Sequence, residues 1–325
     1  MYPIRFGVFL PTGDVGEAMA TAARAERDGF YSVSTNDHFF SPLGTPETPQ
    51  LECFTILTAI AAVTERIRLV PAVAAASFRT PALLAKIAAT LDHVSKGRFV
   101  MGLGAGWQDK EYTAAGYPFP PLKERLAQLD ETVQVLKAMW TQDKPNFAGK
   151  HFTITDLHAN PRPLQKPHIP IRLGGSGTGL LRLAARHADS INMIPPTGNG
   201  KDFVQDKAAT LAFTMDDLKR RIGMLHGFMR EAGRDPASLE LGGLCMLGLS
   251  HDGNDPALRG LGEMLGFPNY EAAQGSPVAL LGTPEQVRTE LAKRIRETGV
   301  TNYIVFPATP DTWDLLVKEV MPAFA

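Results

Sequence analysis

The stretch Leu10-Pro11-Thr12-Gly13-Asp14 closes the first strand-like run of the chain, Ile4–Leu10, and leads into its first helical segment. In an open, doubly wound α/β sheet this first turn usually carries the glycine-rich pattern that binds a dinucleotide. Here the turn contains a single glycine, between a proline-threonine pair and an aspartate. The stretch therefore favours parallel strands that close into a barrel over an open nucleotide-binding sheet.

The rest of the chain repeats the same alternation of short apolar, β-branched runs and segments of helical period, without a Gly/Ser-rich linker. Strands are predicted at Ile4–Leu10, Ser32–Thr35, Ile67–Val73, Phe99–Gly104, Ile171–Gly174, Ser190–Met193, Leu241–Leu247 and Tyr303–Phe306. Helices are predicted at Val15–Asp28, Phe54–Thr64, Pro81–Val94, Arg125–Met139, Gly179–His187, Met215–Ala232, Pro284–Thr298 and Asp311–Met321. Eight β/α repeats can close into one (β/α)8 TIM-type barrel, so we predict an α/β fold with a single domain over residues 1–325.

Local signals at the element boundaries agree with this assignment. Thr80-Pro81 and Thr283-Pro284 place a capping residue before a proline at the first helical position. Gly29, Gly97 and Gly299 stand where helices are expected to end. The predicted elements and their boundaries are therefore consistent with each other.

Three Pro/Gly-rich insertions, Ser41–Gln50, His158–Pro170 and Pro195–Thr214, interrupt the regular repeat. The first and third follow predicted strands, so they lie on the C-terminal face of the barrel, where lids and substrate walls are built. We therefore expect the insertions to shape the substrate pocket.

Composition narrows the function classes. The 325 residues carry a formal net charge of -1 with 44% hydrophobic and 21% charged residues, and they contain no charge block or basic stripe, so nucleic acid is not an expected partner. No apolar run is long enough to cross a bilayer, which favours a cytoplasmic protein without membrane attachment. Cys53 and Cys245 match no metal-ligand spacing and are interpreted as core residues, so neither a disulfide nor a metal site is expected.

In a TIM barrel the catalytic residues follow the C-terminal ends of the strands. After the second predicted strand comes Asn36-Asp37-His38-Phe39-Phe40, which places an imidazole and a carboxylate at the mouth of the barrel. His38 is the candidate catalytic residue, because an imidazole can donate or accept a proton near neutral pH or hold a substrate oxygen by a hydrogen bond. A histidine in a surface turn is the alternative interpretation.

Small residues follow the third and fourth strands. The run from Val70 to Arg79 has little side-chain bulk, so a flat ring could lie against it, although close packing of the next helix would explain the same composition. The turn Gly102-Leu103-Gly104-Ala105-Gly106-Trp107 lets the backbone approach a ligand and supplies an indole that can stack on it.

A glycine-rich turn follows the fifth strand and leads directly into a helix. Gly174-Gly175-Ser176-Gly177-Thr178-Gly179 points several backbone amides and the positive end of that helix at one spot, which is typical of a phosphate site. It lacks the lysine of a nucleoside-triphosphate loop, and an ordinary glycine-rich β/α turn is the alternative. Asn192, in the sixth strand, adds an amide side chain near this turn.

Several segments together resemble the bacterial-luciferase-like monooxygenase superfamily, and above all its branch of deazaflavin-dependent oxidoreductases. The matching segments lie at 23–30, at Asp37-His38, at 78–86, at 95–107, at 111–116, at 167–177 and at 282–287. They cover nearly the whole chain, and as a set they are specific for the superfamily.

The resemblance implies a TIM-type barrel, often a homodimer, that holds coenzyme F420 or FMN with its ring at the barrel mouth. It implies that His38 carries a proton, and that the Ala72-Val73 link is a non-proline cis peptide beneath the ring. The cofactor-binding residues that it implies are Asp37, Ala72, Val73, Ala105, Gly106, Trp107, Glu111, Gly174, Gly175, Gly177, Thr178 and Asn192. Pro42 and Trp107 depart from the family's sugar-phosphate dehydrogenases, so oxidation of a sugar phosphate is not expected.

Three functions follow from this resemblance. The first is hydride transfer between F420 and an unidentified small organic substrate, with His38 moving the proton. The second is an oxygen-using monooxygenase with reduced FMN, for which a flavin reductase would be a partner. The third is a cofactor-binding protein without turnover, against which the intact His38 argues. The Gly/Ala-rich shelf and the Gly-Ala-Gly-Trp turn favour the first.

Overall fold

The computed structural model describes residues 2–42, 45–196 and 206–325. Its main sheet follows the order β3-β2-β1-β12-β10-β9-β8-β5-β4, with β11 paired to β10 beside this path, and all of these pairs are parallel. The strands are β1 (Arg5–Phe9), β2 (Ser32–Thr35), β3 (Arg68–Pro71), β4 (Ala74–Ala75), β5 (Met101–Gly104), β8 (Ile171–Gly174), β9 (Ser190–Met193), β10 (Glu240–Leu249), β11 (Ala279–Gly282) and β12 (Asn302–Pro307).

The two ends of this path meet, because β3 and β4 belong to one stretch of chain. They flank the Ala72–Val73 peptide, which is cis as the resemblance implies, and a parallel bridge from Leu69 to Phe99 joins β3 to the segment before β5. The barrel is therefore nearly closed, and the strands predicted from the sequence all take their places in it. The sequence did not predict β4, β11 or a small antiparallel hairpin of β6 (Phe147–Ala148) and β7 (Thr153–Ile154).

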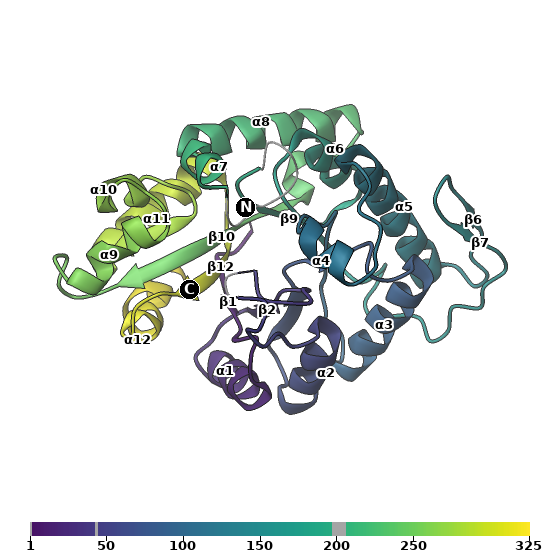
Figure 1. Ribbon diagram of the computed structural model, residues 1–325, viewed down its shortest axis with the longest axis horizontal. Coiled ribbons are helices and arrows are strands. Elements are labelled where there is room, and N and C mark those ends of the chain that lie inside the picture. Colours follow the sequence, from purple (N-terminus) through teal and green to yellow (C-terminus); the bar gives the residue numbers. More distant parts are fainter. Residues whose placement is uncertain (1, 43–44, 197–205) are drawn as a thin grey trace.

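Helices surround the strands (Figure 1). The eight predicted ones are α1 (Val15–Arg27), α2 (Cys53–Val63), α3 (Pro81–Val94), α5 (Leu122–Thr141), α6 (Thr178–His187), α8 (Met215–Glu231), α11 (Pro284–Thr298) and α12 (Thr312–Leu315). The last continues as a π-helical turn, Leu316–Val320, and a 3-10 turn, Met321–Phe324. Unpredicted helices are α4 (Asp109–Ala114), α7 (Lys207–Ala212), α9 (Pro256–Met264), α10 (Tyr270–Gln274) and the 3-10 turn Pro236–Ser238.

The helix boundaries fall at the predicted residues. Thr80 is the N-cap of α3, with Pro81 at the first helical position, but the Thr80 side chain makes no capping hydrogen bond. Asp14, the last residue of the first turn, is the N-cap of α1 and accepts a hydrogen bond from the backbone N–H of Glu17. Thr283 and Gln286 form a capping box at the start of α11. Gly299 ends α11 in the left-handed conformation, with φ of 71°.

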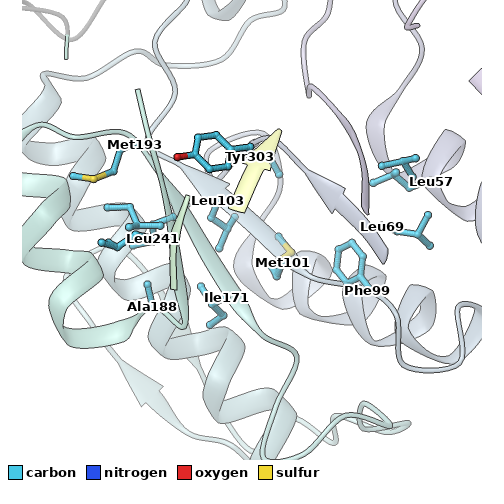
Figure 2. Close-up of a cluster of buried hydrophobic side chains, with 14 of the residues drawn as sticks. Leu57, Leu69, Phe99, Met101, Leu103, Ile171, Ala188, Met193, Leu241 and Tyr303 are labelled. Carbon is cyan, nitrogen blue, oxygen red and sulfur yellow. The ribbon is translucent and has the colours of Figure 1, made fainter. Parts of the chain in front are cut away.

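The core lies between the barrel and its helices. Figure 2 shows part of it, where Leu103, Ile171, Met193 and Leu241 are buried together. Along each strand these outward side chains alternate with side chains that face the barrel axis. Cys53 and Cys245 are both buried and unpaired within this core, in line with the interpretation of each as a packing residue.

The bottom of the barrel holds buried charges. Glu240, at the start of β10, accepts hydrogen bonds from Arg5 (2.7 Å) and from the Asn302 amide (3.1 Å), and Arg172 lies 3.6 Å from its second oxygen. In barrels of this type the N-terminal end serves stability and the C-terminal end serves function.

No helix of the described chain combines the length and the apolar character needed to span a membrane.

Two predicted insertions are described only in part. Ser41–Gln50 includes residues 43–44, and Pro195–Thr214 includes residues 197–205, and both of these segments lie outside the described residues. In the described remainder, Gln50 donates a hydrogen bond to the side chain of Asn36 at 2.8 Å, which ties the first insertion to the end of β2.

Candidate active site

His38 follows β2 at the C-terminal face and is held by a buried carboxylate. Its Nδ1 lies 2.8 Å from Oε1 of Glu111, and Oε2 of Glu111 accepts the backbone N–H of Phe39 at 3.0 Å. The Glu111 side chain is 2% exposed and that of His38 is 11% exposed. Within the described residues no hydrogen bond reaches Nε2, the second ring nitrogen. Donation from Nδ1–H to the carboxylate leaves Nε2 as an acceptor that can exchange a proton.

Trp107 borders the same imidazole. Its ring meets that of His38 edge-on, with centroids 5.4 Å apart and planes at 74°. Gly106, the residue before it, has φ of 76°, and a Cβ there would lie 1.9 Å from the hydroxyl oxygen of Tyr112. Glycine is therefore required at this position for both conformation and space.

Tyr112 connects two loops of the site through a hydrogen bond. Its hydroxyl is 2.6 Å from Oγ of Ser77, and burial raises the pKa of Tyr112 to about 12. It belongs to a cluster of aromatic side chains that also includes Phe78, Tyr117 and Phe119. This cluster fixes the loops that follow β4 and β5.

Asp37 is engaged with Arg79. The Arg79 guanidinium donates to both carboxylate oxygens, at 2.7 and 3.0 Å, and the backbone N–H of Ala75 donates to one of them at 3.1 Å. Burial alone would lower the pKa of the Arg79 guanidinium, but the hydrogen bonds and charges of Asp37 and Glu52 raise it. Asp37 is 5% exposed and positions the loop after β4, while a direct contact with a cofactor stays a prediction.

Val73, just after the cis peptide, lies between the ends of β5 and β8. A Cβ on Gly104 would come within 2.6 Å of its side chain, and a Cβ on Gly174 within 2.7 Å. Both glycines therefore make room for Val73, a reason that the sequence alone did not reveal. Because β5 and β8 are neighbours, the turns that begin at Gly104 and Gly174 start side by side. Ala72, Val73 and Ala105 are all partly exposed here.

The glycine-rich turn after β8 has two parts. Gly175 and Ser176 make hydrogen bonds within the fold, whereas Gly177 and Thr178 form the start of α6. The backbone N–H of Gly175 donates to the carbonyl of Asn192 at 2.9 Å, and Ser176 donates its hydroxyl to the Ile194 carbonyl. Gly177 is the N-cap of α6, where no side chain of the described residues caps the helix. A Cβ at Gly177 would meet no described atom within 4 Å, and Thr178 is exposed.

The side chain of an arginine on α8 holds this turn in place. Arg221, on α8, donates to the Ser176 carbonyl at 2.8 Å and to the Asp217 carboxylate at 2.6 Å. Asn192 faces the barrel axis at the level of Gly174, and its buried side-chain oxygen has no partner in the part of the chain that the structure describes. The open end of α6 suits an anionic group, while Arg221, which is paired with Asp217, holds the turn that leads to it.

The structure thus brings the predicted residues together in two adjacent groups, one around His38, Glu111 and Trp107 and one at Gly177 and Thr178. Sequence reasoning missed the roles of Arg79 and Arg221. Arg79 stands directly before the Thr80-Pro81 boundary, but nothing in its local pattern points to Asp37, which lies 42 residues away. Among the described residues no cluster of side chains could hold a metal ion.

Comparison with known proteins identifies a family and several related chains. Residues 2–247 match the model of the family described as luciferase-like monooxygenase. The pyrimidine monooxygenase RutA of Allorhizobium ampelinum is 30% identical over 73% of this chain and 65% of its own. An F420-dependent glucose-6-phosphate dehydrogenase of Amycolatopsis mediterranei is 29% identical over 65% of this chain and 64% of its own. The chain thus spans just under two thirds of the length of these relatives.

A solved structure agrees with the fold along the whole chain. An F420-dependent secondary alcohol dehydrogenase, in complex with an F420-acetone adduct, superimposes with a TM-score of 0.81 at 22% identity and covers 100% of both chains. This likeness supports the (β/α)8 barrel found above.

Proposed function

This chain belongs to the luciferase-like monooxygenase family, and from that premise we propose that it is an oxidoreductase that transfers a hydride between coenzyme F420 and a small organic substrate. The observation that carries the proposal is the imidazole of His38, with Nδ1 fixed on the buried Glu111 and Nε2 open to a substrate. Oxidation of an alcohol releases a hydride and a proton, so a hydride acceptor must be accompanied by a proton acceptor.

The described residues fit a deazaflavin or flavin cofactor. The uncapped start of α6 at Gly177 and Thr178, with space where a side chain would stand, suits its phosphate. Val73, Ala105 and Trp107 offer a partly exposed, mostly apolar border for its ring. When bound, F420 would supply the two-electron acceptor or donor for the hydride.

The residues of the chain supply the proton chemistry. In the oxidative direction Nε2 of His38 takes the hydroxyl proton of the substrate, and in the reductive direction it returns a proton to the carbonyl oxygen. The Glu111 carboxylate stabilises the imidazolium that forms and fixes the orientation of the ring. Trp107 packs beside the imidazole, with ring centroids 5.4 Å apart, and restricts the space in which the ring can turn.

An oxygen-using monooxygenase with reduced FMN is the second candidate. The relationship to RutA favours it, because that relative is named as a monooxygenase. The same residues would hold the ring and the phosphate of FMN, and a flavin reductase would be the partner that delivers the reduced cofactor. Both candidate functions include a cytoplasmic location and assembly into a homodimer. Light scattering after size exclusion tests whether the protein is a dimer.

Equilibrium binding of the purified protein to F420 and to FMN, each oxidised and reduced, tests the proposal. Cofactor fluorescence reports the binding. Preference for F420 supports the hydride-transfer function, and preference for reduced FMN supports the monooxygenase. Failure to bind any of the four forms would contradict the cofactor assignment altogether.

The variant Gly177→Asp tests the phosphate site. The new carboxylate would cap α6, so the melting temperature is expected to stay equal or rise slightly. The same carboxylate would compete with a phosphate for the helix amides and repel it, so the Kd for the cofactor should rise at least about tenfold. Calorimetric titration and thermal unfolding measure the two effects.

Gly177→Ala is the matched control, because a Cβ at Gly177 meets no described atom within 4 Å. Its affinity for the cofactor should stay within about threefold of the parent protein, since it adds no charge. If Gly177→Asp binds the cofactor as tightly as Gly177→Ala does, the phosphate lies elsewhere.

The variant Glu111→Gln tests the positioning of His38. Glu111 accepts hydrogen bonds on both oxygens, one from the Phe39 N–H and one from His38. A glutamine that still accepts from Phe39 must turn its NH2 group to Nδ1, which forces the proton onto Nε2 and removes the acceptor. We expect kcat to fall on the order of 100-fold with KM and cofactor Kd nearly unchanged. A parallel loss of kcat and cofactor affinity would indicate a collapsed site instead.

A further inference from the structure

Four apolar side chains near the barrel mouth do not take part in the core. Phe9, Leu244, Met246 and Phe306 are all partly exposed, and none of them belongs to the hydrophobic clusters of the described residues. Their neighbours along the strands behave differently, because Val8, Cys245, Leu247 and Val305 are each at most 1% exposed. A group of partly open apolar side chains in an otherwise buried stretch is typical of ligand pockets, which are lined mainly by apolar residues.

The register of the sheet places these side chains on the inner face of the barrel. Gly174 faces the axis, since a Cβ there would point at Val73. Residues paired across parallel strands share a face, which leads from Gly174 to Asn192, Gly242, Asn302 and Arg5. Steps of two residues then place Phe9, Leu244, Met246 and Phe306 on the same inner face, towards the C-terminal ends of their strands.

These four residues form one continuous surface, which we call the apolar wall. The rings of Phe9 and Phe306 stack at a centroid distance of 4.5 Å. Their strands are neighbours in the order β2-β1-β12-β10, so the wall begins beside the strand that leads to His38 and extends away from it. Phe9 pairs in register with Ser34, four positions before His38.

The inner face changes character along the same strands. Its lower positions carry Arg5, Glu240 and Asn302, which bind one another, whereas its upper positions carry only the apolar wall. At the mouth, the Arg79 guanidinium is paired with Asp37 and Glu52, and the Arg125 guanidinium donates to the Gly106 carbonyl. Among the described residues the apolar wall itself contains no cation, so a phosphate or carboxylate of the substrate placed against it would be desolvated without a partner there, which is costly.

We propose that the substrate is an uncharged alcohol or carbonyl compound whose organic part is apolar, with its oxygen at His38 and its hydrocarbon against the apolar wall. This inference rests on the proposed function, because it concerns the substrate of that same site. Phe306 and Met246 act as specificity-determining residues, because they belong to the apolar wall that the hydrocarbon of the substrate would contact.

Calorimetric titration with cyclohexanone and with cyclohexanone that bears a ring carboxylate tests the substrate class. Both ligands are titrated into the protein alone and into the protein with saturating oxidised F420. The neutral ketone is expected to bind at least about tenfold more tightly, with a negative heat-capacity change from burial of apolar surface. The variant Met246→Lys, which sets an ammonium into the wall, should reverse the preference.

Met264→Lys is the matched control, because Met264 is 65% exposed on α9 and the same substitution there should leave the preference unchanged. Equal or tighter binding of the carboxylated ketone to the parent protein, with and without F420, would overturn the inference. An unchanged preference in a folded Met246→Lys variant would overturn it as well. If the protein binds neither F420 nor FMN, only the cofactor proposal is contradicted. The preference between the two ketones is still measured, because the calorimetric titration detects binding and needs no turnover.

Discussion

Replacing His38 by alanine should lower kcat by about 10²- to 10⁴-fold, the range for loss of a positioned acid-base group. The imidazole is the only group at the centre of the site described here with a fixed orientation and an open ring nitrogen. The Kd for the cofactor should change little, because the proposed phosphate site is the start of α6 at Gly177 and Thr178 and does not include His38. Steady-state turnover and cofactor titration on the same preparation measure both quantities.

His158→Ala serves as the control, because His158 is an exposed histidine outside the site. It removes the same side chain without touching the described site and should leave kcat unchanged. If His38→Ala turns over as fast as His158→Ala, the proton is carried by another group and the mechanism proposed above is wrong. If His38→Ala loses cofactor affinity to the same extent as turnover, the ring of His38 is part of the cofactor site instead.

Arg98→Met should have the largest effect on stability. The Arg98 guanidinium donates five hydrogen bonds, to the carbonyls of Ser95, Ile67, Ala61 and Thr64 and to the Thr64 hydroxyl, at 2.7–2.9 Å. Residues 61 and 64 belong to the C-terminal end of α2, whose last carbonyls have no helical donor. Without the guanidinium these buried acceptors lose their donors, so the free energy of unfolding should fall by about 3–5 kcal/mol.

Arg66→Met is the control for that change. Arg66 lies in the same connection between α2 and β3, but it is exposed and makes one long hydrogen bond of 3.5 Å with its side chain. Arg66→Met should lower the free energy of unfolding by no more than about 0.5 kcal/mol, as for most surface substitutions. Denaturant unfolding of both variants gives the comparison, and a similar small loss for Arg98→Met would show that water replaces the guanidinium.

Local signals in the sequence were enough for the order of the barrel elements. Hydrophobic period and capping chemistry act over a few residues, so the Thr80-Pro81 and Thr283-Pro284 boundaries and Gly299 identify helix ends without any knowledge of the fold. The same signals missed α9, α10 and β11. These short elements pack around a separate hydrophobic cluster that includes Leu258, Phe267 and Tyr270, and contacts between elements leave no hydrophobic period in the sequence.

The candidate site, like the fold, has features that the sequence predicts and features that only the tertiary structure sets. The sequence by itself determined the (β/α)8 order and the position of His38, Trp107 and Gly177 in turns after strands, because strand direction alone brings those turns to one face. Only the tertiary structure decided that Glu111 holds His38, that Arg79 neutralises Asp37 and that Val73 fits between two glycines. Each of these contacts joins residues far apart in the chain, and their partners are selected by the register and closure of the barrel, which no local pattern encodes.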